Sequence, residues 1–103
     1  MGNEFNHLIK LVFAGDGLAA AQLVQNYEGE IRRIIRFRLR DPKLRRVIDS
    51  TDICQSVFAN FFLGASLGKF DLSSPQDLIN LLAKMATNRV IDRHRSEKSQ
   101  RNL

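Results

Sequence analysis

Few residues of this 103-residue chain have the types and spacing that enzymes use for chemistry. The histidines, His7 and His94, each lack a second ligand at the spacing of a metal site. The single cysteine, Cys54, excludes an intramolecular disulfide, and its apolar helical surroundings predict a buried structural thiol. Asp49 and Asp52 could share acid–base work, but helix capping explains them without special chemistry. We therefore expect neither an enzyme nor a bound cofactor.

Basic side chains offer a different chemistry, the binding of polyanions. The formal net charge is +5, and it is unevenly spread. Residues 28–48 contain eight Lys and Arg against three Asp and Glu, and residues 84–103 contain six against two. Residues 49–83, which lie between them, contain one Lys or Arg and four Asp or Glu. Because Arg pairs well with phosphate and Asn can read base edges, the segment around Asn88 favours nucleic-acid binding. A solvated cationic face explains the same residues equally well.

The elements that must position these residues are predicted to be helices. Apolar residues recur at helical spacing, and no alternating strand pattern is present. We expect an all-α fold, a compact bundle of about four helices. The expected helices cover residues 4–13, 18–40, 49–64 and 75–96, with a connection at 43–48, a loop at 64–74 and a polar, frayed tail at 97–103. Gly29 weakens the second helix, so a bend is expected there.

Helix boundaries carry the sharpest local signals. Asp16 is the expected N-cap of the second helix, and Asp49 is among several candidates for the third. Ser74, Pro75 and Asp77 form the clearest start signal, for the last helix. The length fits one domain. The longest apolar run is too short to span a membrane, and we find no secretory leader. We therefore expect a cytoplasmic protein.

Three stretches, in order, resemble the promoter-binding domain (region 2) of bacterial extracytoplasmic-function sigma factors. Gly15-Asp-Gly17 and the helix through Tyr27 resemble the family's "GD…A…L…Y" opening. Asp49-Ser-Thr-Asp-Ile-Cys-Gln-Ser-Val-Phe58 resembles "D-x-x-D-V-V-Q-E-V-F". Residues 70–93, which include Leu-Ala-Lys-Met-Ala-Thr-Asn-Arg-Val-Ile-Asp-Arg, resemble "F…W-L-Y-R-I-A-R-N-x-x-I-D-R". The resemblance covers about residues 15–96.

The resemblance implies two partners. In such proteins the acidic helix docks on the clamp helices of the largest catalytic subunit of RNA polymerase core. The residues that match this role are Asp49, Asp52, Gln55 and Phe58. The last helix and its preceding loop recognise and melt the promoter element nearest the start site, and hold a base of the non-template strand. The matching residues are Lys69, Phe70, Asp71, Lys84, Asn88, Arg89 and Arg93. An anti-sigma factor is a further candidate partner.

The chain departs from the family pattern at several points. Ser56 stands where the family has glutamate, and Leu81 and Ala83 replace a tryptophan and a tyrosine. Full members also carry a helix-turn-helix domain, for which 103 residues leave no room, so we expect it to be absent. The chain is then either an excised domain or a shortened molecule. The interpretation from another class is a helical protein-interaction module with only non-specific nucleic-acid affinity. For Phe70 in particular, plugging the end of the core is the plainer expectation.

Overall fold

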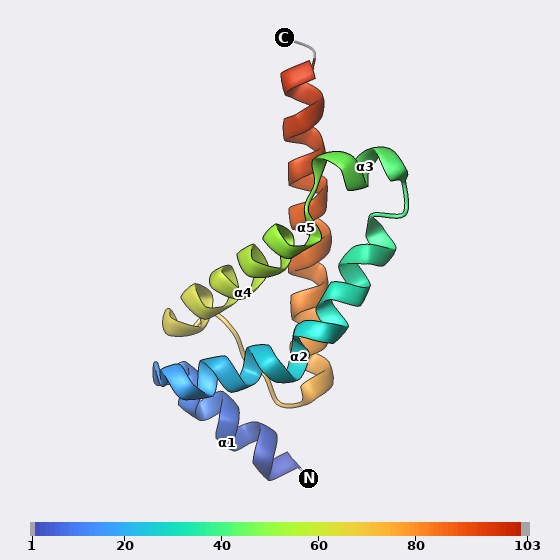
Figure 1. Cartoon of the computed structure of the whole chain (residues 1–103). Coiled ribbons are helices and arrows are strands. Elements are labelled where there is room, and N and C mark those ends of the chain that lie inside the picture. Colours follow the sequence, from blue (N-terminus) through green and yellow to red (C-terminus); the bar gives the residue numbers. More distant parts are fainter. Residues whose placement is uncertain (1, 102–103) are drawn as a thin grey trace.

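The residues that the structure describes form five helices joined by short connections (Figure 1). They are α1 (Gly2–Phe13), α2 (Gly17–Arg38), α3 (Pro42–Val47), α4 (Ser50–Ser66) and α5 (Pro75–Arg101). The fold is a computed structural model that describes residues 2–101, and the side chains of residues 4–46 and 48–96. No strand occurs among the residues described, so the all-α prediction is confirmed.

Side-chain caps begin the helices where the sequence predicts them. Asp16 Oδ1 accepts hydrogen bonds from the backbone N–H groups of Leu18, at 2.9 Å, and Ala19, at 3.1 Å. Asp49 Oδ1 accepts one from the N–H of Thr51, at 2.8 Å. Each bond satisfies an N–H that has no partner within its own helix. The predicted starts of α2 and α4 are therefore confirmed.

The expectation of a bare connection at residues 43–48 is wrong, because most of it forms α3. Asp41 is the N-cap of this short helix and accepts a hydrogen bond from the N–H of Lys43, at 2.9 Å. Pro42 then occupies the first turn, where its missing N–H costs nothing. The Asp-Pro pair thus begins a new helix, and α2 ends before it, at Arg38.

The core lies where α2 packs against α1, α4 and α5, and where α4 packs against α5. Burial removes apolar side chains from water, which is the main favourable contribution to folding. The side chains with no exposed surface are those of Leu23, Ile31, Ile35, Phe61, Leu78, Leu82 and Ala86. Helix α2 bends near its middle, so that its two halves run in different directions (Figure 1).

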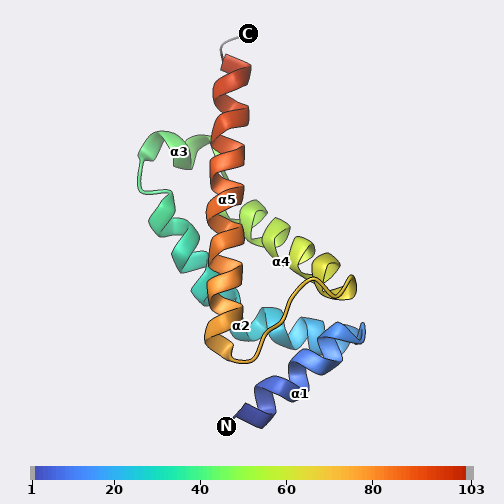
Figure 2. The ribbon, with the colours of Figure 1, turned by 180° about the vertical axis from the view of Figure 1, so that it is seen from behind.

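Helix α5 is the longest element and runs along the long axis of the molecule (Figure 2). Its first half lies across α2 and α4, and its second half continues past the bundle. The expected frayed tail differs from the structure, since α5 remains helical to Arg101; residues 102–103 lie outside the described range. Within that range, no helix is both long and apolar enough to cross a membrane.

Candidate polymerase and nucleic-acid interfaces

The outer edge of α4 carries most of the residues predicted to bind polymerase. Asp49, Asp52 and Gln55 are exposed and follow one another at about one-turn intervals. At 1.5 Å per residue they span about 9 Å of helix axis. Phe58, predicted for the same role, is 5% exposed and packs near Phe62, with ring centroids 6.4 Å apart. Its side chain therefore anchors α4 in the core, and the polar residues form the accessible edge.

A hollow of about 240 Å³ lies beside Gln55, between α2 and α4. Its α2 side, where Glu28 and Arg32 form an ion pair one turn apart, was not predicted from the sequence. Their i,i+4 spacing was the available signal. The residues that line this hollow are Val24, Glu28, Arg32, Thr51, Cys54, Gln55 and Phe58. A partner that contacts Gln55 therefore also meets charged groups of α2.

Cys54 has the structural character that its surroundings predict. The side chain is 4% exposed and belongs to the core. Burial, helped by the negative charge of Glu28, raises the pKa of the Cys54 thiol above its ordinary value. A raised pKa keeps the thiol protonated and unreactive near neutral pH. Among the described residues, no three His, Cys, Asp or Glu side chains group as metal ligands.

The loop between α4 and α5, residues 67–74, is held to the core by Phe70. The ring of Phe70 stacks on that of Phe61, with centroids 5.5 Å apart and planes 7° apart. The stack needs a glycine on α4, because a Cβ at Gly64 would lie 2.5 Å from Cε2 of Phe70. Gly68 provides the turn out of α4 with a φ of 68°. Phe70 therefore plugs the end of the core, which is the simpler of the two roles expected for it from the sequence.

The same loop forms one wall of a second hollow, of about 380 Å³, at the start of α5. The other wall includes Asn80, a residue that sequence analysis missed; its side chain accepts a hydrogen bond from Gln76 at 2.9 Å. The lining residues are Lys69, Phe70, Asp71, Leu72, Asp77, Asn80 and Leu81. The structure thus brings the three predicted loop residues together at one open cavity.

The predicted residues of α5 continue from this hollow along the helix. Lys84 and Asn88 are exposed one turn apart, whereas Arg89 and Arg93 are partly buried on the flank. Nε of Arg89 is buried and has no hydrogen-bond partner among the described residues. From Lys84 to Arg93 the helix rises about 14 Å, the length of several nucleotides along a backbone. Lys84 and Asn88 therefore continue the polar rim of the hollow along α5 as one strip. Arg89 and Arg93 lie about 140° and 180° around the helix from Lys84, so they flank this strip.

Asp77 fixes the junction of the loop and α5. Its Oδ2 accepts hydrogen bonds from the Ser73 hydroxyl, at 2.8 Å, and from the Ser73 N–H, at 3.1 Å. Its own N–H donates to Ser74 Oγ at 3.2 Å, which confirms the predicted helix start. These bonds, those from Ser73 first, hold the pKa of the Asp77 carboxyl below its ordinary value.

A depressed folded-state pKa makes stability depend on pH in a defined direction. The stabilisation from the Asp77 carboxylate is present above its unfolded pKa, about 3.9, and is lost as pH falls through its lower folded value. We expect Asp77→Asn to be less stable than wild type at neutral pH, with the difference shrinking below about pH 4. Urea denaturation across pH measures this, with Asp92→Asn, an exposed position on α5, as the control. A constant difference across pH contradicts the role given to the carboxylate.

The chain was also compared with known proteins. A protein-family model described as ECF sigma factor matches residues 2–102, nearly the whole chain. No curated protein matches it. No solved structure matches it either. The family match includes the outer edge of α4, the loop hollow and the strip along α5 within a single span.

Proposed function

The chain belongs to the family of ECF sigma factors, and from this membership we propose that it binds RNA polymerase core and recognises and melts promoter DNA. The observation that carries the proposal is the placement of two unlike surfaces on neighbouring helices. One is the acidic and polar edge of α4, and the other is the strip formed by the loop and α5. A regulatory factor that joins an enzyme to its template needs two such surfaces.

The α4 edge is the proposed polymerase surface. Asp49 and Asp52 supply negative charge that suits a basic partner surface, and complementary charges raise both specificity and association rate. Gln55 stands beside the hollow between α2 and α4, into which a partner side chain could insert. Phe58 supports this edge from within the core. Glu28 and Arg32 join the surface from α2.

The loop and α5 are the proposed promoter surface. Arg89 and Arg93 favour backbone phosphates, and Asn88 suits a base edge. The hollow beside Lys69 and Asp71 is the proposed receptor for an unpaired base. A flipped base needs polar groups for its edge and an apolar wall for its face, and Leu81 with the edge of Phe70 supplies that wall.

The test separates the two surfaces. We expect Asp52→Arg to weaken capture of purified polymerase core tenfold or more, at least about 1.4 kcal/mol, because it places like charges together. Enrichment of a motif from randomised single-stranded DNA should be unaffected. Asn88→Ala should leave polymerase capture unchanged and weaken binding to that motif by about 1–3 kcal/mol.

Matched controls make the result specific. Glu30→Arg makes the same charge change on an exposed part of α2, and Asn26→Ala removes an exposed amide there. Glu30→Arg should leave polymerase capture unchanged, and Asn26→Ala should leave binding to the DNA motif unchanged. Failure of the folded wild-type protein to capture polymerase overturns the docking assignment. Capture without any enriched DNA motif favours the protein-interaction module with non-specific nucleic-acid affinity.

A further inference from the structure

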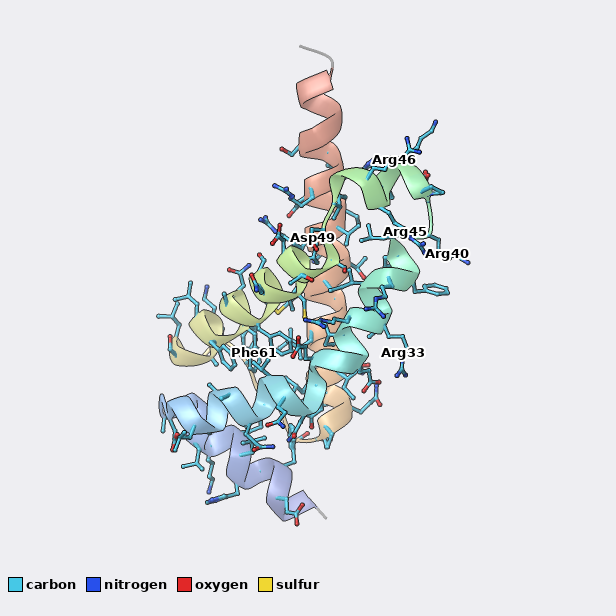
Figure 3. All side chains as sticks on the ribbon, viewed as in Figure 1. Arg33, Arg40, Arg45, Arg46, Asp49 and Phe61 are labelled. Carbon is cyan, nitrogen blue, oxygen red and sulfur yellow. The ribbon has the colours of Figure 1, made fainter. Side chains whose placement is uncertain are left out.

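The basic segment at residues 28–48 takes no part in the proposed surfaces, apart from Glu28 and Arg32. Its arginines gather at the end of α2 and on α3, and several of them point outward from the bundle (Figure 3). We define the α2–α3 arginine surface by its side chains on these two helices and the turn between them, which are Arg33, Arg36, Phe37, Arg40, Arg45 and Arg46. The three on α2, Arg33, Arg36 and Phe37, follow i, i+3, i+4 spacing and so share one face of the helix, and Arg40 lies in the turn that follows it.

This surface contains a hollow of about 580 Å³ beneath the α2–α3 turn, lined by Arg36, Arg45 and Arg46. Nε of Arg45 donates to the backbone oxygen of Leu39 at 2.7 Å, which fixes the orientation of its guanidinium group. Asp49 also lines the hollow, and its carboxylate is engaged in capping α4. A planar group with fixed donors is well suited to a tetrahedral anion, since Arg binds phosphate through two parallel hydrogen bonds.

The charge of this hollow is net positive, because three arginines line it against the single carboxylate of Asp49. Among the described side chains the ion pair found joins Arg32 to Glu28, and neither residue lines the hollow. Arg36, Arg45 and Arg46 are all exposed. Exposed arginines without carboxylate partners keep their full attraction for an external anion.

An exposed aromatic ring lies on the same face of α2. Phe37 is 60% exposed, although a phenyl ring gains free energy by leaving water. The guanidinium carbon of Arg40 sits 4.4 Å from the centre of the ring, on one of its faces. Aromatic rings interleaved with cationic side chains are typical of surfaces that bind unpaired nucleotides.

We propose that the α2–α3 arginine surface is a second nucleic-acid site, which binds a single strand. A backbone phosphate occupies the hollow, and a base stacks on Phe37. A duplex would satisfy the arginines but leaves no base free for the ring, whereas a single strand offers a phosphate and an unstacked base at each nucleotide. The proposal deepens the proposed function by adding a contact for melted DNA, and it is tested without polymerase or promoter sequence, so the two can fail separately.

The experiment measures binding of a short oligothymidylate to the full chain by fluorescence anisotropy over a range of salt concentrations. Log affinity should fall linearly with log salt, and each lost phosphate contact should reduce the slope by about 0.7. We expect Arg36→Ala/Arg46→Ala to reduce both the affinity and the slope. Phe37→Ala should reduce the affinity about fivefold while leaving the slope unchanged, because stacking releases no counterions.

The control pair is Arg38→Ala/Lys10→Ala, which removes two exposed positive charges outside the surface. It should leave the slope nearly unchanged, and circular dichroism checks that every variant is folded. If the control pair loses as much affinity and slope as Arg36→Ala/Arg46→Ala, diffuse net charge explains the binding and the proposal is overturned. Binding of inorganic phosphate or a free nucleotide as tight as the oligonucleotide would indicate a small-molecule site instead. Equal sensitivity of polyglutamate binding to the same variants would indicate an acidic protein partner, and would also overturn the proposal.

Discussion

Phe61→Ala should destabilise the protein by about 3–5 kcal/mol, the typical cost of removing a fully buried phenyl ring. Phe61 has no exposed surface, and its ring contacts those of Phe62, at 5.5 Å, and Phe70, also at 5.5 Å. The lost stability combines the hydrophobic transfer free energy of the removed ring with the cost of the cavity left behind. A fall in the midpoint of urea denaturation, followed by circular dichroism, measures it. Because small domains have only about 5–15 kcal/mol of stability, this loss is a large part of the total.

The change should also release the loop before α5, because the ring of Phe70 loses its stacking partner. This is detected by comparing amide hydrogen exchange in the variant and in wild type, at a temperature where the variant is folded. The increase should be larger across residues 67–74 than across α2. Leu63→Ala is the matched control, since Leu63 lies on the same helix but is 62% exposed. Its expected effect is within about 0.5 kcal/mol. Equal destabilisation by the two changes would contradict the packing described for Phe61.

Gly64→Ala and Gly29→Ala should shift stability in opposite directions, although both replace a glycine inside a helix. Alanine is better than glycine in a helix by about 1 kcal/mol. At Gly29 a Cβ meets nothing within 4 Å, so this gain should appear almost in full. At Gly64 the Cβ would lie 2.5 Å from Cε2 and 2.6 Å from Cζ of Phe70, and one of the groups must move. Overpacking costs about 1–3 kcal/mol, so a net loss is expected.

Denaturation midpoints of the two variants provide the comparison, each against wild type. In Gly64→Ala we also expect weaker binding of single-stranded DNA at the loop hollow, because displacing Phe70 moves Lys69 and Asp71 with it. Gly64→Ala/Phe70→Ala tests the cause, since removing the ring removes the clash. If the double variant loses as much stability as the sum of the single changes, the contact between these two residues is not the reason.

The helix starts were the most predictable features of the fold. Asp16, Asp49 and Ser74 each act on N–H groups two or three residues further along the chain, so their neighbours in sequence are their neighbours in space. Helix α3 was missed because six residues are too few to display an apolar period. Its cap and its proline were nevertheless visible at Asp41 and Pro42, where we interpreted them only as the end of a helix.

The candidate interfaces were predictable in part, for a related reason. Exposure of Asp52, Gln55, Lys84 and Asn88 follows from helical spacing, because positions one turn apart share a face. The contribution of Glu28 and Arg32 to the α4 edge could not be predicted, since it depends on how α2 crosses α4. Asn80 was missed at the loop hollow because the path of the loop decides which α5 residues face it.

The amino-acid sequence by itself determined the helical class, the main helix starts, the buried thiol of Cys54 and the resemblance to ECF sigma factors. All of these depend on short-range spacing or on the order of motifs. The tertiary structure alone decided that Phe70 stacks on Phe61, that Gly64 must lack a side chain, and that three arginines of α2 and α3 surround one hollow. These features depend on contacts between segments distant in sequence, and the packing of apolar faces, rather than any local signal, brings such segments together.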